Sequence, residues 1–340
     1  MDHGFPHLLI VLVAILVATK VLGELAQRVG QPAVLGELIA GVLLGGSLLG
    51  VLDPSDPIIR ALSEIGVIVL LFEIGLHTDL RELVSVGASA MTVAVVGVAV
   101  PFALGYGVAH LLGLGVVPAI VCGASLTATS IGISARVLSD LGQLETPEGR
   151  VVLGAAVLDD VIGLIILSVV STLVAGEAVS LGGVGVSVAA ATVFILAALW
   201  IGNRIALPAF DIISRVDRSG TLGVVALAFA LLLAWLASFA RSAPIVGAFA
   251  AGLVLYRAPQ SAEIQRKVAT LGQFFVPIFF ASVGAAVDLT TLGDTRTALI
   301  GSALIAVALV GKFVAGYGPW WFKGNKALVG VAMIPRGEVG

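Results

Sequence analysis

The amino-acid sequence predicts an all-α protein that crosses a membrane many times. Of its 340 residues, 59% are hydrophobic and only 11% are charged, whereas a soluble domain carries about 25% charged residues. The apolar residues form runs of roughly the length that crosses a bilayer. Short loops containing Asp, Pro, Gly and Arg separate these runs. We therefore expect one integral membrane domain built from packed helices.

Twelve hydrophobic segments are predicted along the chain, with ends accurate to about a few residues. They cover approximately 5–27, 33–50, 61–77, 86–110, 116–139, 149–175, 182–203, 220–239, 243–257, 267–287, 297–318 and 325–340. The 42 glycines suit the close helix contacts of membrane proteins. A single cysteine, Cys122, excludes an internal disulfide and a cysteine-built metal site. No motif indicates an enzyme, a bound cofactor or nucleic-acid binding.

Lysine and arginine are distributed unequally between alternate loops, which predicts the orientation. The loops after odd-numbered segments carry the larger set and are expected in the cytoplasm, with the N-terminus outside. That set comprises Arg28, Arg81, Arg136, Arg150, Arg204, Arg215, Arg218, Arg257, Arg266, Lys267, Lys323 and Lys326. The opposite loops hold only Arg60, Arg241 and Arg296.

Two stretches of sequence recur at a nearly constant offset. Gly36 and Gly41 match Gly247 and Gly252 at an offset of 211 residues. The residues GLHTDL at 75–80 match GAAVDL at 284–289 at an offset of 209. The matched segments are seven apart, an odd number, so the two copies cross the membrane in opposite directions. This pattern predicts an inverted repeat, as secondary transporters use.

The repeat aligns two segments that both look interrupted. SLTATSIGIS at 125–134 is polar and contains glycine, and MIPRGEVG at 333–340 contains the helix breakers Pro335 and Gly337 next to the charged Arg336 and Glu338. Interrupted helices at membrane depth are tolerated where they line a cavity. The chain stops within the second of them, so we expect a thirteenth helix to be missing and the sequence to be truncated at its C-terminus.

Two adjacent carboxylates, Asp159 and Asp160, lie in the middle of the apolar run VVLGAAVLDDVIGLIILSVV at 151–170. An aspartate at the bilayer centre costs about 2.5–3.5 kcal/mol on insertion scales. The pair therefore needs a cation, a proton or a buried partner. Neighbouring residues of a helix point about 100° apart. One carboxylate can thus face a pathway while the other faces a neighbouring helix.

Lys312 is the natural partner of the aspartates, because an amine inside an apolar helix needs a carboxylate or must lose its proton. Snorkelling of Lys312 toward the cytoplasm is the alternative. Lys20 and Glu24, one helical turn apart, are expected to pair with each other.

Several weaker candidates surround the aspartate pair in the predicted fold. The hydroxyls of Thr127, Thr129 and Ser130 offer oxygen ligands to a hard cation, although such hydroxyls also bond back to their own helix. Glu73 could line the cavity. Arg336 and Glu338 could neutralise each other across the second break, which is a structural role.

Four stretches resemble the bacterial sodium/proton antiporters of the monovalent cation:proton antiporter superfamily. They are PAVLGELIAGVLLG, SLTATSIGISARVLSDLG, AAVLDDVIGLIIL and MIPRGEVG. The aspartate pair is similar to that of the electrogenic branch of this superfamily. The resemblance implies an inverted-repeat fold with two crossing discontinuous helices, of which about 12 of 13 helices are present. It also implies a homodimer in the bacterial inner membrane.

The resemblance further implies roles for individual residues. Asp160 would be the main carboxylate that binds the ion and carries the proton, and Asp159 would pair with Lys312 until a cation breaks that pair. Thr129 and Ser130 would lie beside the ion, so that Na⁺ would be held at Asp160, Asp159 and Thr129. Segments at about 86–175 and 297–340 would form a moving core, those at 5–77 and 220–287 a dimerisation scaffold, and 182–203 the linker.

The predicted function is exchange of Na⁺, or Li⁺, for H⁺ by alternating access, with a role in pH homeostasis. A potassium-efflux type of K⁺/H⁺ antiporter is the first alternative. A sodium-coupled symporter of organic anions is a second, although only Lys312 and Arg336 could form its anion pocket. An inactive fragment that only inserts and dimerises is a third.

Overall fold

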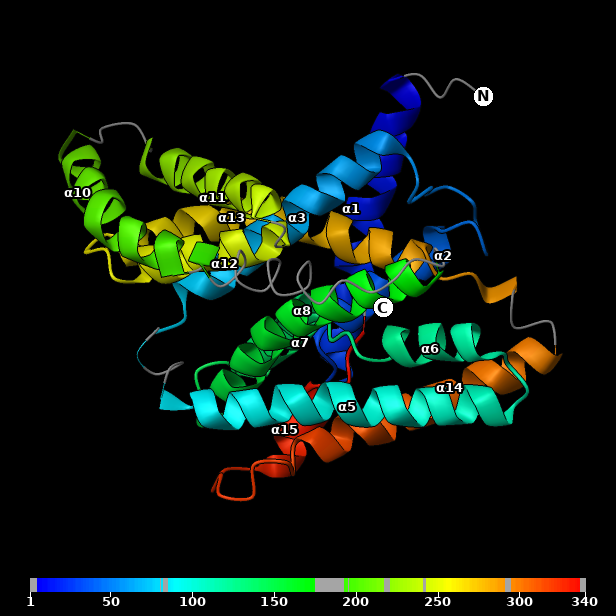
Figure 1. The fold of residues 1–340 in the computed structure, drawn as a ribbon. Helices are drawn as coiled ribbons and strands as arrows, with labels where there is room; N and C mark the ends of the chain where they lie inside the picture. Colours follow the sequence, from blue (N-terminus) through cyan, green and yellow to red (C-terminus); the bar gives the residue numbers. More distant parts are fainter. Residues whose placement is uncertain are drawn as a thin grey trace. The chain divides into compact units, whose positions relative to one another are not determined.

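The structure is a computed structural model in which every regular element of the described residues is helical (Figure 1). It describes residues 5–79, 81, 85–174, 193–194, 196–216, 221–240, 243–290 and 295–336. Asp160 lies in a described helix, but its side chain is outside the described part. Most of the predicted segment 182–203 and Glu338 are outside it as well. The all-α class that the composition predicted is confirmed.

The helices group into two compact units. The first comprises Met1–His77, Gly202–Leu233 and Ala248–Gly293, and the second comprises Thr78–Ile201, Ala234–Gly247 and Asp294–Gly340.

Four helices form the centre of the first unit. They are α1 (Phe5–Arg28), α2 (Ala33–Leu44), α3 (Pro57–Leu76) and α13 (Ser261–Ala285). Helix α13 packs against the other three, and α1 packs along α2. Buried Val11, Ile15, Leu44 and Ile278 join them in one apolar cluster. Asp56 begins α3, because its carboxylate accepts hydrogen bonds from the N–H groups of the first turn.

Glycines allow two close helix crossings in the first unit. A Cβ on Gly284 of α13 would overlap the Leu38 carbonyl and lie 3.0 Å from the Cα of Gly41 on α2. A Cβ on Gly75 of α3 would lie 2.9 Å from the Cα of Gly252 on α12 (Pro244–Tyr256). These four glycines are among those matched by the sequence offset, so the two crossings use equivalent positions. Only glycine permits backbones to approach so closely.

Six helices make up the described centre of the second unit. They are α5 (Gly87–Leu111), α6 (Val116–Ser125), α7 (Ile131–Asp140), α8 (Pro147–Val174), α14 (Thr295–Ala315) and α15 (Lys326–Ala332). Helices α5 and α14 lie side by side (Figure 1), and α5 also contacts α6 and α8. Gly311 makes the contact of α14 with α5 possible, since a Cβ there would lie 2.9 Å from Pro101 Cγ.

Three expectations are wrong in detail. Helix α2 ends at Leu44 rather than near residue 50, because the chain turns through Gly45 to Gly50, and Gly50 has a positive φ of 61°. The stretch taken as a loop after residue 203 is helical as η1 (Gly202–Ala206) and α10 (Leu207–Val216). Glu24 accepts from Arg28 at 3.3 Å, so its partner lies one turn after it and not at Lys20.

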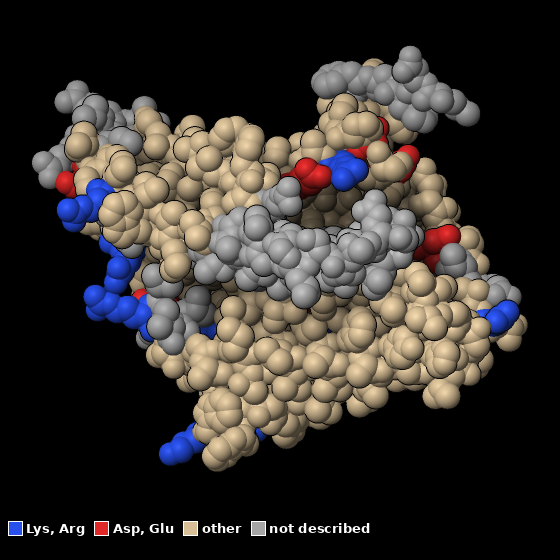
Figure 2. Space-filling model, in the orientation of Figure 1, with Lys and Arg blue, Asp and Glu red and all other residues tan. Residues whose placement is uncertain are grey.

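The described surface suits a lipid environment. Within the described residues, five helices are long and apolar enough to cross a membrane, and α11 (Thr221–Phe239) is one of them. The five stretches are Pro6–Arg28, Gly87–Leu111, Thr221–Phe239, Ser261–Ala285 and Thr295–Ala315. Figure 2 shows that charged side chains are sparse on the visible face. Exposed Leu, Val and Ile side chains along α1 would be unfavourable in water, whereas contact with lipid tails is favourable.

Candidate functional site

The first of the two expected breaks separates α6 from α7. Helix α6 ends at Ser125, and residues 126–130 are not helical. Helix α7 then begins at Ile131, where the Oγ of Ser130 accepts a hydrogen bond of 3.3 Å from the N–H of Ile133. This cap satisfies one of the free N–H groups at the start of α7. The polar sequence TATS therefore ends one helix and starts the next, as its composition predicted.

The second break follows α15 and lies against the first. Residues 334–336 are not helical. The N–H of Ser130 donates to the carbonyl of Pro335 at 3.0 Å. The Nη1 of Arg336 donates to the carbonyl of Ala128 at 3.2 Å. Two hydrogen bonds thus join the interrupted stretches to each other within the second unit.

A buried ion pair lies in the same unit. Lys312 Nζ of α14 is 3.1 Å from Asp159 Oδ2 of α8, and the two residues are 0% and 2% exposed. Lys312 therefore does not snorkel to the surface. Removing one member of such a buried pair typically costs about 3–5 kcal/mol, because the other charge is left uncompensated.

Glycine and proline on α5 shape the space around Lys312. A Cβ on Gly97 would lie 3.6 Å from Lys312 Nζ, an ordinary contact distance, so the lysine side chain packs against this part of α5. Pro101, one turn later, has no N–H to donate to the Gly97 carbonyl. Lys312 thus lies between Asp159 of α8 and a turn of α5 that lacks one helical hydrogen bond.

The three hydroxyls of the first break have different partners. Thr127 Oγ1 donates back to the Ala124 carbonyl at 2.7 Å, and Ser130 Oγ caps α7. The hydroxyl and N–H of Thr129 face the Asp159 carboxylate. Nevertheless, Thr129 Oγ1 and Asp159 Oδ1 have no partner of normal hydrogen-bond geometry among the described residues. Two buried oxygens are therefore available to a ligand.

One further buried oxygen was not anticipated from the sequence. Ser134 Oγ, in the first turns of α7, is in a residue only 2% exposed and has no hydrogen-bond partner within the described part of the chain. A buried polar group without a partner costs about 1–3 kcal/mol unless water or an ion satisfies it. A serine in a helix carries no sequence signal that separates this situation from ordinary back-bonding.

For three other predicted site residues, the structure gives no position relative to Asp159. The side chain of Asp160 and all of Glu338 lie outside the described part of the structure. Glu73 belongs to the first unit, where its Oε2 would be 2.9 Å from a Cβ on Gly272 of α13. The expected pairing of Arg336 with Glu338 therefore stays a prediction.

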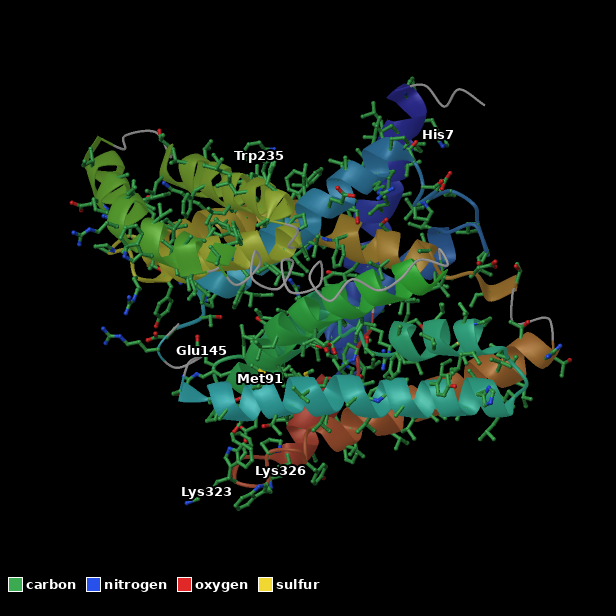
Figure 3. All side chains as sticks on the ribbon, in the orientation of Figure 1. His7, Met91, Glu145, Trp235, Lys323 and Lys326 are labelled. Carbon is green, nitrogen blue, oxygen red and sulfur yellow. The ribbon has the colours of Figure 1, made fainter. Side chains whose placement is uncertain are left out.

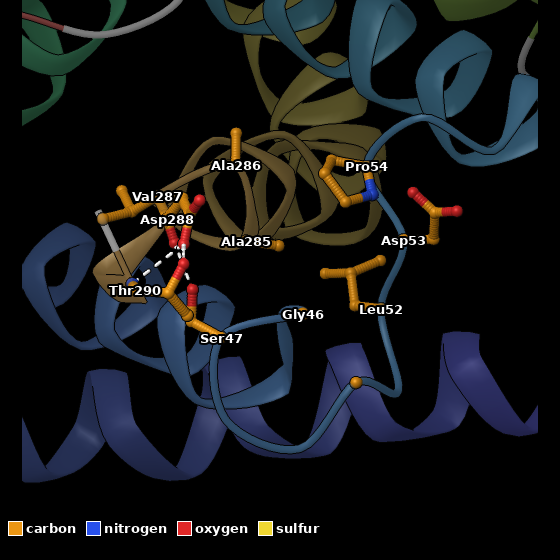
Figure 4. Close-up of a pocket in the computed structure, with 11 residues that line it drawn as sticks. Gly46, Ser47, Leu52, Asp53, Pro54, Ala285, Ala286, Val287, Asp288 and Thr290 are labelled. Atoms are coloured by element: carbon orange, nitrogen blue, oxygen red, sulfur yellow. Dashed lines mark hydrogen bonds between the residues drawn. The ribbon is translucent and has the colours of Figure 1, made fainter. Parts of the chain in front are cut away.

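A cavity of about 560 Å³ lies elsewhere, between the loops that follow α2 and α13 in the first unit (Figure 4). Its two carboxylates, those of Asp53 and Asp288, accept hydrogen bonds from the backbone of their own loops. Asp288 Oδ1 accepts from the N–H of Thr290 at 2.9 Å, and Asp53 Oδ1 accepts from the N–H of Ser55 at 2.8 Å. Ser47 ties the two loops together through its bond to the Val287 carbonyl. We regard this cavity as a feature of the loops.

The arrangement around Asp159 can bind a small cation or a proton. The carboxylate has one oxygen on Lys312 and the other free of hydrogen bonds among described groups, and Thr129 adds a hydroxyl oxygen. Hard monovalent and divalent cations prefer such oxygen ligands. Among the described residues there is no group of three or more His, Cys, Asp or Glu side chains suited to a metal ion.

Comparison with known proteins gives a family match over nearly the whole chain. The family described as "Sodium/hydrogen exchanger, transmembrane" matches residues 10–340. The high-affinity Na⁺/H⁺ antiporter NhaS3 of Synechocystis sp. is 39% identical over 98% of this chain and 81% of its own length. The Na⁺/H⁺-K⁺ antiporter GerN of Bacillus cereus is 33% identical over 96% of this chain and 84% of its own.

The fold matches a solved structure as well. The sodium proton antiporter MjNhaP1 from Methanocaldococcus jannaschii aligns with a TM-score of 0.68, over 96% of this chain and 85% of that protein. The sequence identity is 17%, so this likeness concerns the fold alone.

Proposed function

Because the chain belongs to the sodium/hydrogen exchanger family, we propose that it exchanges Na⁺, or Li⁺, for H⁺ across a membrane. The observation that supports this function best is the buried Asp159–Lys312 pair, whose carboxylate keeps one oxygen without a hydrogen bond among the described groups. The carboxylate lies beside Thr129, at the point where the two interrupted helices meet. Similar proteins named as Na⁺/H⁺ antiporters add support.

The proposed mechanism is competition for one site. A carboxylate away from water binds a proton readily, and a cation that reaches the same oxygens displaces that proton. The protonated or cation-loaded site carries less net charge than the empty one. It is therefore less costly to move across the low-dielectric interior. Exchange follows because the site crosses the membrane mainly when it is loaded.

Each predicted residue has a role in this proposal. Asp160 is the main acid for the ion and the proton, and Asp159 and Thr129 supply further oxygens for Na⁺. Lys312 neutralises Asp159 when the cation is absent, and the Lys312–Asp159 ion pair breaks when the cation binds. Ser130 supports the site through its backbone contact with Pro335.

Exchange of K⁺ for H⁺ is the second candidate, and the relatives include proteins named for potassium. GerN is named a Na⁺/H⁺-K⁺ antiporter, and KhtU of Bacillus subtilis, at 26% identity, is named a K⁺/H⁺ antiporter subunit. Exchange measured with equal gradients of Na⁺, Li⁺ and K⁺ separates the two. We expect Na⁺ and Li⁺ to drive proton movement at lower concentrations than K⁺.

The protein is a multi-pass membrane protein, and we propose further that it resides in the bacterial inner membrane with its N-terminus outside. Lys323, between α14 and α15, and Lys326, the first residue of α15 (Figure 3), then face the cytoplasm. A membrane-impermeant maleimide should label a cysteine placed at Lys323 only from the cytoplasmic side. We also propose an inverted repeat, a homodimer, and a division into the scaffold, core and linker defined above. Cross-linking in native membranes checks the dimer.

The exchange function is tested by reconstituting the full chain into liposomes that contain a pH-sensitive dye. A sodium gradient should move protons in the opposite direction. The variant Asp160→Asn should lose this activity while it remains folded, because it removes the charge that binds Na⁺ and carries the proton. Unimpaired exchange in Asp160→Asn would overturn the site. No Na⁺-driven proton movement in the wild type would overturn the function.

A further inference from the structure

Arg336 is a positive charge near the Asp159–Lys312 pair that the exchange mechanism does not yet use. It is half-buried and lies in the interrupted stretch after α15. Its Nη1 donates to the Ala128 carbonyl at 3.2 Å. Its Nη2 is buried and has no partner among the described residues. The guanidinium is also close enough to Asp159 for a charge–charge attraction.

The two cations near Asp159 are held in different ways. Lys312 Nζ contacts the carboxylate itself, at 3.1 Å, through a flexible four-carbon stem. Arg336 is held by a backbone carbonyl of the first break, and its neighbour Pro335 accepts from the Ser130 N–H. A guanidinium is a rigid, permanently charged group. A cation that enters can therefore displace Lys312, whereas Arg336 stays in place.

The stretch that Arg336 contacts is negative for a second reason. Helix α6 ends at Ser125, and the C-terminal end of a helix carries the equivalent of roughly −0.5 charge. The Ala128 carbonyl follows shortly after this end. Without Arg336, Asp159 and the Ala128 carbonyl would attract a cation together. A transport site must release its ion as well as bind it, so excessive attraction slows turnover.

We propose that Arg336 is a positioning residue that holds the Thr129 stretch in place and, as a fixed charge, limits how tightly the site binds Na⁺. This inference rests on the exchange function proposed above. Among the described residues, the charged and polar groups that interact with Asp159 are Lys312 from α14, Thr129 from the first break and Arg336 from the second.

The proposal fixes the direction of change in two variants. Arg336→Gln removes the charge, so Na⁺ and H⁺ should both bind more tightly. At a pH high enough that protons no longer compete for the site, the KM for Na⁺ should fall about five- to tenfold, as expected for one unit charge at short range, and the maximal rate should fall with it. Half-maximal exchange should move to higher pH, because the proton also leaves less readily. Arg336→Lys keeps the charge and should keep the KM within about threefold.

Exchange by the full chain in liposomes is measured over a range of Na⁺ concentrations and pH values. The rise in thermal midpoint on adding NaCl gives a second readout that does not need transport. Arg136→Gln is the matched control, because Arg136 pairs with Asp140 on α7 rather than with the crossing, and its KM should be unchanged. A merely structural role for Arg336 would lower the amount of folded protein but would not lower the KM.

The outcomes divide cleanly. A lower KM and a larger Na⁺-induced thermal shift in Arg336→Gln support the proposal, and an unchanged or higher KM overturns it. If Arg336→Gln does not fold, Arg336→Lys decides: a KM within about threefold of wild type supports the proposal, and a larger change overturns it. If the wild type shows no Na⁺/H⁺ exchange, the proposed function itself is wrong. Failure of the Arg336 proposal can therefore be distinguished from failure of the proposed function.

Discussion

At the scale of the residue, the two oxygens of Asp159 have different surroundings. Oδ2 contacts Lys312 at 3.1 Å, whereas Oδ1 has no hydrogen bond of normal geometry among the described groups. Leaving such a buried acceptor unpaired costs about 1–3 kcal/mol. The unpaired oxygen therefore lowers stability. A buried polar group that lowers the stability of a membrane protein usually indicates a functional site.

The Thr129 hydroxyl gives a prediction at this scale. Thr129→Val keeps the shape of the side chain and removes an oxygen that has no partner among the described residues. The thermal midpoint should stay the same or rise, while the KM for Na⁺ should rise about tenfold, equivalent to about 1.4 kcal/mol of binding. Thr127→Val is the control, since its hydroxyl bonds the Ala124 carbonyl and its loss should lower stability more than affinity. A wild-type KM in Thr129→Val would contradict the role of this oxygen.

The sequence identified Asp159, Lys312 and Thr129 as candidates because polar groups are rare in apolar segments, and the structure brings these three together. The sequence could not distinguish the role of Thr129 from the roles of Thr127 and Ser130. A hydroxyl that caps a helix, bonds back to its own helix or faces a ligand has the same sequence pattern. The sequence also missed Ser134 and the Ala128 carbonyl. Backbone acceptors in particular leave no trace in the amino-acid identities.

At the scale of the element, the close crossings of α2 with α13 and of α3 with α12 depend on glycine. Gly41→Ala would place a methyl group on the Ala281 carbonyl, so the two backbones must separate. We expect a loss of about 1–3 kcal/mol, as for other overpacked sites, seen as a lower thermal midpoint in detergent. Gly301→Ala on α14 is the control, because nothing lies within 4 Å of its Cβ, and it should be neutral or stabilising. Equal midpoints for the two variants would contradict the crossing.

The existence of the long helices was predictable, because each is an apolar run of membrane length. Their ends and the short elements were not. Helix α10 has only ten residues, too few to span a membrane. The stretch also contains Arg204 and Arg215, so the sequence predicted a loop there. The break between α6 and α7 was predictable from its polar residues. Its hydrogen bonds to Pro335 and Arg336 were not, since they join residues about 200 positions apart.

At the scale of the whole molecule, the account makes one central claim: Na⁺ and H⁺ compete for the carboxylates of α8. Asp159 is buried among these helices, and the first interrupted stretch brings Thr129 to it. The inverted repeat stays a prediction, although the equivalent glycine crossings of the first unit are the kind of contact it requires. Exchange, ion selectivity and the effect of Arg336 all depend on the competition.

The most direct test is to count the protons released when Na⁺ binds. The purified full chain is placed in weakly buffered detergent solution at neutral pH, and NaCl is added while the pH is recorded, with choline chloride as the control salt. The account predicts release of about one proton per chain, because a carboxylate must be deprotonated to bind a cation. No release is expected from the double variant Asp159→Asn, Asp160→Asn. Saturable Na⁺ binding by the wild type without any proton release would contradict the central claim.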